Sequence, residues 1–107
     1  MDIHALNAIA VKMVMPGQGL LAADESTGTI GKRFGSIQTE STFDSRRDWR
    51  EMLFRCENAM KDHVSGVILY DETLRQNAAD GTPLVDLIKS HDSIPGIKVD
   101  MGTTPLA

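Results

Sequence analysis

The sequence has 107 residues, which is enough for one compact domain and too few for two. Hydrophobic residues make up 41% and charged residues 24% of the chain, a balance typical of a globular protein rather than a disordered one. The net charge of -4 provides no electrostatic footprint for nucleic acid, and no apolar run approaches the roughly 18 residues of a membrane span.

The cysteine content and the N-terminus bear on the cellular compartment. The one cysteine, Cys56, cannot form an internal disulfide and therefore favours a reducing environment. Asp2 precedes the first apolar stretch and Lys12 interrupts it, unlike in a secretory signal peptide. We therefore expect a soluble, cytoplasmic protein.

Along the chain, the first pattern is a helix followed by a strand. Apolar residues at helical spacing predict an amphipathic helix that begins near Asp2 and stops before Pro16. Residues 19–23 are apolar throughout, which predicts a strand buried on both faces, as in a parallel sheet. A second helical pattern covers residues 30–37.

The strongest helical pattern runs from about residue 43 to residue 60, and Thr42 is its expected N-cap. Its expected buried face carries five side chains at helical spacing: Trp49, Met52, Leu53, Cys56 and Met60. Residues 66–70 predict a second strand, a helix follows from Thr82-Pro83, and residues 95–100 predict a third strand. Strands alternating with helices indicate an α/β fold with a parallel sheet.

Each predicted strand ends in an acidic residue, at Asp24, Asp71 and Asp100. The carboxyl ends of parallel strands form one rim, where ligands bind in such folds, so these acids indicate a polar site. Aspartate also begins loops and caps helices, and the pattern alone supports both interpretations about equally.

Lys98 interrupts the apolar third strand two residues before Asp100. Alternation along a strand places both side chains on one face. Burying a lysine on a central strand is costly unless it is paired or meets a ligand. We therefore favour a functional Lys98 slightly over a structural ion pair or a lysine that extends to water.

Residues 24–29 place three hydroxyls and a glycine directly before a predicted helix. Free backbone N–H groups at a helix start, with Arg33 nearby, are typical of a phosphate site. The segment matches neither the P-loop nor the dinucleotide fingerprint, and Ser and Thr are also ordinary N-caps. The histidines lie far apart in the sequence, so we predict no metal site.

Several segments, in one order along the chain, resemble the class I fructose-bisphosphate aldolases. They are GLLAADESTGTIGKR (residues 19–33), SGVIL (65–69), ETL (72–74), DGTP (80–83), GIKVD (96–100) and PLA (105–107). The resemblance covers nearly the whole chain, and several long motifs in one order are far more specific than any single motif.

The resemblance implies a TIM (β/α)8 barrel, of which residues 1–107 would be the N-terminal part with about three β/α units. It implies a glycolytic lyase that cleaves fructose 1,6-bisphosphate, a phosphorylated ketose, into dihydroxyacetone phosphate and glyceraldehyde 3-phosphate. The family uses a lysine Schiff base and no metal or other cofactor, and its full-length enzymes are often homo-tetramers. The implied site residues are the catalytic Asp24 and Lys98, the phosphate contacts Ser26, Thr29 and Arg33, and Arg46 at the margin.

The family's Schiff-base lysine lies on the sixth strand and its acid/base glutamate on the fifth, both beyond Ala107. Because such a barrel needs about 250 residues, we expect an inactive fragment of a single barrel domain, with its first and third strands as open edges. One alternative is a non-catalytic module that binds sugar phosphates or a partner. Another, ranked last, is a receiver-type domain that uses the three strand-end acids and Mg²⁺.

Overall fold

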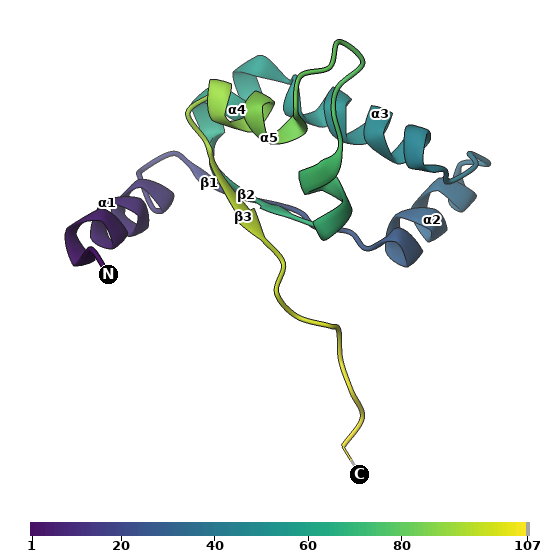
Figure 1. The fold of residues 1–107 in the computed structure, drawn as a ribbon, viewed down its shortest axis with the longest axis horizontal. Coiled ribbons are helices and arrows are strands. Elements are labelled where there is room, and N and C mark those ends of the chain that lie inside the picture. Colours follow the sequence, from purple (N-terminus) through teal and green to yellow (C-terminus); the bar gives the residue numbers. More distant parts are fainter. Residues whose placement is uncertain (107) are drawn as a thin grey trace.

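Three parallel strands form one sheet in the computed structural model, which describes residues 1–106 (Figure 1). The strands are β1 (Gly19–Ala23), β2 (Val64–Leu69) and β3 (Ile94–Ile97), in the order β1-β2-β3. Leu21 pairs with Val67, which in turn pairs with Pro95. The parallel sheet is therefore confirmed, and β1 and β3 are the edges of the sheet in the described residues, as predicted.

In the described residues one helix precedes the first strand, and the other helices connect the strands and lie mainly on one side of the sheet (Figure 1). In chain order the helices are α1 (Ile3–Met13), α2 (Thr27–Ser36), α3 (Phe43–Phe54), α4 (Glu57–His63), the 3-10 helix η1 (Asp71–Arg75) and α5 (Leu84–Ser90). Within residues 1–106, none of the helices combines the length and apolar character needed to cross a membrane.

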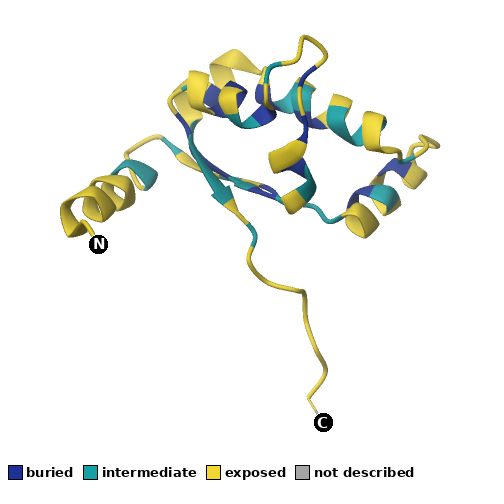
Figure 2. Cartoon of the chain, viewed as in Figure 1, coloured by how far each residue is buried: buried dark blue, intermediate teal, exposed yellow. Residues whose placement is uncertain are grey.

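Side-chain caps explain where two of the helices begin. The Asp2 carboxylate accepts the backbone N–H groups of His4 and Ala5, at 3.0 and 3.1 Å, so α1 begins where the sequence predicts. Thr42 and Ser45 form a reciprocal capping box at the start of α3. Helix α1 buries none of its residues and projects from the rest of the molecule, as Figures 1 and 2 show.

The core lies between the sheet and the helices α3, α4 and α5 (Figure 2). Its most deeply buried apolar side chains are Phe54, Met60, Val67, Leu69, Leu84 and Ile88, each at most 1% exposed. Burying a side chain of this size contributes about 1.5–3 kcal/mol relative to leaving it in water. This core fixes the positions of the ends of β2 and β3, where the polar residues gather.

The prediction that the first strand is buried on both faces is wrong. Ala23 is buried at 2% exposure and Leu21 packs against the core, whereas Leu20, on the opposite face, is 53% exposed. The reason is that β1 is an edge strand, and its second face has no covering element among residues 1–106. The continuous apolar run nevertheless identified the strand at its observed position.

The single helix predicted for residues 43–60 is also wrong, because the chain forms two helices with a break at Arg55 and Cys56. Cys56 leaves the helical region with ψ 82°, and α4 then leads directly into β2 at Val64. Arg55 is held at the break by Glu51 and Asp80, at 2.8 and 3.1 Å. The break redirects the chain toward the sheet. The position of the sheet depends on tertiary structure, so the spacing of apolar residues along the helix does not predict the break.

The predicted buried face of that helix is only partly right. Met60 is buried, but Trp49 and Met52 are 39% and 54% exposed, and Cys56 is exposed. The inward positions of α3 are Arg50, 1% exposed, and Phe54. The predicted face was wrong because a helical pattern is read from apolar residues, and an arginine is then assigned to the surface. Arg50 was therefore not placed on the buried face.

Candidate functional site

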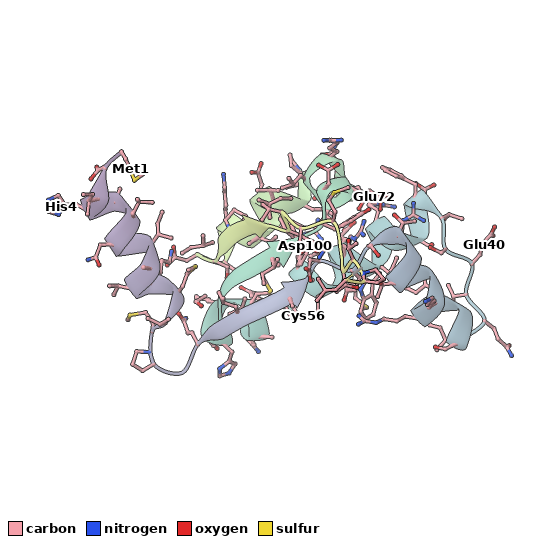
Figure 3. The ribbon with its side chains drawn as sticks, turned by 90° about the horizontal axis from the view of Figure 1, so that it is seen from below. Met1, His4, Glu40, Cys56, Glu72 and Asp100 are labelled. Carbon is pink, nitrogen blue, oxygen red and sulfur yellow. The ribbon has the colours of Figure 1, made fainter. Side chains whose placement is uncertain are left out.

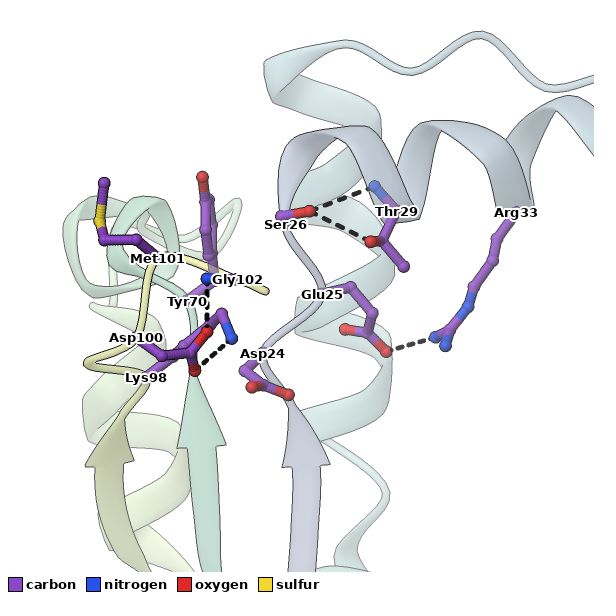
Figure 4. Close-up of a pocket in the computed structure, with 10 residues that line it drawn as sticks. All are labelled: Asp24, Glu25, Ser26, Thr29, Arg33, Tyr70, Lys98, Asp100, Met101 and Gly102. Atoms are coloured by element: carbon purple, nitrogen blue, oxygen red, sulfur yellow. Dashed lines mark hydrogen bonds and ion pairs between the residues drawn. The ribbon is translucent and has the colours of Figure 1, made fainter. Parts of the chain in front are cut away.

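A cavity of about 500 Å³ opens at the carboxyl ends of the strands, beside the start of α2 (Figure 4). Its lining residues are Asp24, Glu25, Ser26, Thr29, Arg33, Tyr70, Lys98, Asp100, Met101 and Gly102. Because the strands run parallel, their ends bring together segments that are more than 40 residues apart in sequence, as from Asp24 to Tyr70. This is the edge of the sheet where the sequence placed a polar site.

An ion pair lies at the centre of the cavity. Lys98 Nζ donates to Asp100 Oδ2 at 2.5 Å, and the second oxygen of that carboxylate accepts the Gly102 N–H at 2.8 Å. The hydrogen bond to Asp100 is the main cause that raises the pKa of Lys98, and the charge of Asp24 adds to it. The same hydrogen bond lowers the pKa of Asp100, and the Gly102 N–H lowers it further.

The third strand is shorter than predicted. It ends at Ile97, so Lys98 and Asp100 lie in the segment after it rather than on its face. The Lys98 N–H still donates to the Leu69 carbonyl of β2 at 2.8 Å, which continues the sheet's hydrogen bonding by one residue. Beyond this point the backbone leaves the sheet (Figure 1), because no strand beside β3 is present in the described residues to extend the pairing.

The start of α2 supplies hydroxyl and backbone donors to the cavity. Ser26 is the N-cap: its Oγ accepts the Thr29 N–H at 3.3 Å and donates to Thr29 Oγ1 at 3.1 Å. The first N–H groups of any helix have no partner within the helix, and the helix dipole is positive at this end. Ser26 and Thr29 are therefore brought together, and the site can accept an anion.

Arg33 reaches back from α2 to the carboxylate of Glu25, with Nη1 to Oε1 at 2.6 Å (Figure 4). The Arg33 side chain is 64% exposed and that of Glu25 is 14% exposed. Glu25 was not among the predicted site residues, although it directly follows the strand-end Asp24. The structure thus adds a second carboxylate to the wall of the cavity beside Asp24.

Arg46 lies outside the lining of the cavity. Its Nε and Nη2 each donate to an oxygen of Glu72 at 2.9 Å, and Arg50 Nη1 donates to Glu72 at 2.7 Å. Hydrogen bonds first from Arg46 and then from Arg50 lower the pKa of Glu72 to about 2. Figure 3 labels Glu72 where η1 meets α3. The cluster joins these two elements, so Arg46 already has a structural partner.

The strand-end acids are only partly brought together. Asp24 and Asp100 both line the cavity, whereas Asp71 begins η1 and pairs with Arg75 at 3.0 Å. His4 projects from the outer end of α1 (Figure 3). Within residues 1–106, no three His, Cys, Asp or Glu side chains are grouped to hold a metal ion. The receiver-type hypothesis therefore loses the three-acid cluster on which it depended.

Six of the lining residues were singled out from the sequence: Asp24, Ser26, Thr29, Arg33, Lys98 and Asp100. The other four were missed. They are Glu25, Tyr70, Met101 and Gly102. Tyr70 directly follows β2, so its position at a strand end was a signal that could have found it, as it found Asp24. Glu25 and Met101 each directly follow a strand-end acid, and this position next to Asp24 or Asp100 was the signal that could have found them.

The family model described as "Glycolytic: Fructose-bisphosphate aldolase class-I" matches residues 5–107. A fructose-bisphosphate aldolase from Echinococcus multilocularis is 53% identical over 100 residues, which are 94% of this chain and 27% of that protein. The relative from Arabidopsis thaliana named "Fructose-bisphosphate aldolase 6, cytosolic" is 55% identical over 102 residues, 95% of this chain and 28% of that protein.

A solved structure shows the same likeness in three dimensions. Fructose-bisphosphate aldolase from Plasmodium falciparum, in a ternary co-crystal structure with TRAP and a small-molecule inhibitor, is 43% identical with a TM-score of 0.88. The match covers 96% of this chain and 29% of that one. The chain therefore spans less than a third of the length of these relatives.

Proposed function

This chain belongs to the class I fructose-bisphosphate aldolase family, and we propose that it forms part of the active site of an enzyme that cleaves fructose 1,6-bisphosphate. The products are dihydroxyacetone phosphate and glyceraldehyde 3-phosphate. One observation carries the proposal: Lys98 and three carboxylates line a cavity at the strand ends, beside a helix start suited to phosphate.

In this proposal Lys98 acts as a fixed positive charge. Its pKa is raised by the hydrogen bond to Asp100, so the amine stays protonated and is a poor nucleophile. A charged ammonium at this place can donate to the oxygens of a ketose and stabilise negative charge that develops on them. Lys98 is the only lysine among residues 1–106 that lines the cavity.

The Schiff-base lysine is therefore proposed to lie outside residues 1–107. Since the covalent chemistry needs an unprotonated amine, and Lys98 is held in its charged form, another lysine has to supply it. No metal or cofactor enters the proposed reaction. These 107 residues alone are proposed to be catalytically inactive and to be part of a (β/α)8 barrel.

Asp24 is proposed as the carboxylate that orients the reacting amine and assists proton transfers. It directly follows β1, is partly buried, and lines the same cavity as Lys98 (Figure 4). No ion pair involves Asp24 among the described residues, so its carboxylate is available to the reacting groups. A carboxylate within hydrogen-bond reach of the reacting groups can take up and return a proton, which is what general acid–base catalysis requires.

The phosphate of the substrate is proposed to bind at the start of α2. Ser26, Thr29 and Arg33 supply hydroxyls and a guanidinium there, and the helix start adds backbone donors. Arg46 remains a predicted contact at the margin, although its guanidinium is engaged by Glu72. We also propose a cytosolic protein, which the printed name of the Arabidopsis relative supports.

The test is a steady-state assay of the natural protein that contains residues 1–107. Cleavage of fructose 1,6-bisphosphate is followed through the release of glyceraldehyde 3-phosphate, with fructose as the unphosphorylated control substrate. The proposal expects turnover of the bisphosphate and little or none of fructose. Binding of the bisphosphate without cleavage would support the alternative of a non-catalytic sugar-phosphate module and contradict the proposed activity.

A further inference from the structure

The side chains that line the cavity carry a net negative charge, which opposes an anionic ligand, although the start of α2 offers donors to one. Three carboxylates, Asp24, Glu25 and Asp100, face two cations, Arg33 and Lys98, so the formal charge of the lining is three negative against two positive, or -1. A phosphate dianion that enters this cavity brings further negative charge. Binding therefore needs a cation that can leave its carboxylate partner and pair with the phosphate instead.

Both cations of the lining form ion pairs within the cavity. Lys98 is paired with Asp100, and Arg33 with Glu25 at 2.6 Å. The two pairs differ in how firmly the cation is anchored. The backbone N–H of Lys98 is hydrogen-bonded to β2, whereas the Arg33 side chain is 64% exposed at the surface of α2. The Glu25 side chain is 14% exposed, so Arg33 is the partner with room to move.

We propose that Glu25 is a positioning residue: it holds the Arg33 guanidinium in an ion pair, and an incoming phosphate takes its place as the partner of Arg33. The inference rests on the proposed phosphate role of the α2 start. The ion pair with Glu25 holds the guanidinium at the wall of the cavity that Ser26 and Thr29 also line (Figure 4). When phosphate binds, Arg33 exchanges its charge-assisted hydrogen bond to Glu25 for one to the phosphate. The exchange is favourable because a phosphate dianion carries more negative charge than a single carboxylate.

If Arg33 exchanges partners in this way, Glu25 competes with phosphate for Arg33 and lowers the affinity of the site for phosphate. The pair is largely solvent-exposed on the arginine side, and exposed ion pairs contribute up to about 1 kcal/mol. Removing the charge of Glu25 releases Arg33 and lowers the cost of the exchange. The expected effect is about 3- to 5-fold tighter binding of phosphate.

The experiment measures the dissociation constant of inorganic phosphate for the natural protein by titration calorimetry. Four proteins form a double-mutant cycle: wild type, Glu25→Gln, Arg33→Gln and the double variant. We expect Glu25→Gln to tighten binding, Arg33→Gln to weaken it, and most of the Glu25→Gln gain to disappear when Arg33 is absent. Asp71→Asn is the matched control, because it removes one charge outside the cavity.

The outcomes separate this inference from the proposed function. If Glu25→Gln leaves phosphate binding unchanged or weaker while Arg33→Gln weakens it, the exchange is wrong and the phosphate role of Arg33 stands. An equal gain with and without Arg33 would mean simple repulsion and also overturns the exchange. If Arg33→Gln has no effect, the proposed phosphate role itself fails. Thermal unfolding midpoints of all variants verify that each protein is folded.

Discussion

The ammonium of Lys98 and the carboxylate of Asp100 form a 2.5 Å ion pair immediately after β3, in a cavity that they share with Asp24 at the end of β1. The sheet sets this arrangement, because β2 lies between the two strands and fixes how far apart their ends are. The hydrogen bond to Asp100 raises the pKa of Lys98, and the role proposed for Lys98 depends on its staying charged.

Replacing Asp24 by Asn in the natural protein should lower kcat by about 100- to 10,000-fold, the range typical of a lost general acid–base group. The amide keeps the size of the side chain and removes its charge and basicity. The measurement is the steady-state cleavage of fructose 1,6-bisphosphate. Asp71→Asn, a strand-end acid that pairs outside the cavity, is the control and should leave kcat unchanged. Normal turnover of the Asp24 variant would remove the catalytic assignment.

Replacing Lys98 by Met should lower kcat by about 100-fold or more, because a preorganised donor is lost while the length of the side chain is kept. Replacement by Arg, which keeps the charge, should restore part of the rate. Since the pKa of Lys98 is raised above its ordinary value near 10.4, the ammonium stays charged up to at least about pH 10.

The pH dependence of kcat/KM tests the same assignment. Between pH 7 and about pH 10 the wild-type profile and that of the Lys98→Arg variant should have the same alkaline shape, because neither residue loses its proton there. An alkaline loss of activity that vanishes in the Arg variant would show that Lys98 titrates in this range. That result would contradict its role as a permanent charge.

Stability at low pH should depend on Glu72. Its pKa is lowered from 4.5 to about 2, so its contribution to the free energy of unfolding is present above pH 4.5 and is lost as the pH falls toward 2. The full loss is up to about 3 kcal/mol, from a shift of about 2.5 units at 1.36 kcal/mol each. Urea unfolding of wild type and Glu72→Gln from pH 7 to pH 2 measures it, and parallel curves would contradict this account.

Arg33 and Arg46 should differ when each is replaced by Gln. Arg33 lines the cavity, so its loss should raise KM for the bisphosphate by about 10-fold or more, as expected for a lost charge-assisted hydrogen bond. Arg46 is engaged by Glu72, so its loss should mainly lower the unfolding temperature. A comparable rise in KM for the Arg46 variant would return Arg46 to the phosphate contacts.

The sequence predicted the parts of this fold that depend on local patterns. Strand β1, the start of α1 after Asp2 and the N-cap at Thr42 lie where the apolar patterns and the capping residue predicted them. Strand-end acids identified the rim of the sheet, since the carboxyl ends of parallel strands meet at one edge.

What the sequence missed depends on tertiary structure. The helix break at Cys56 follows from the direction in which α4 must enter β2, and the burial of Arg50 follows from its contacts with Glu72 and Gln76. The inclusion of Glu25 in the cavity depends on the reach of Arg33 from α2. These contacts join residues whose separation in the sequence follows neither the helical nor the strand repeat, so a pattern along the chain does not predict them.

The most direct test of the account is to identify the lysine that forms the Schiff base. The natural protein is incubated with dihydroxyacetone phosphate, reduced with borohydride and digested, and the modified peptide is found by mass spectrometry. The account predicts one covalent adduct, on a lysine outside residues 1–107, with Lys98 unmodified. An adduct on Lys98 would contradict its role as a fixed charge, and the absence of any adduct would contradict the proposed aldolase activity.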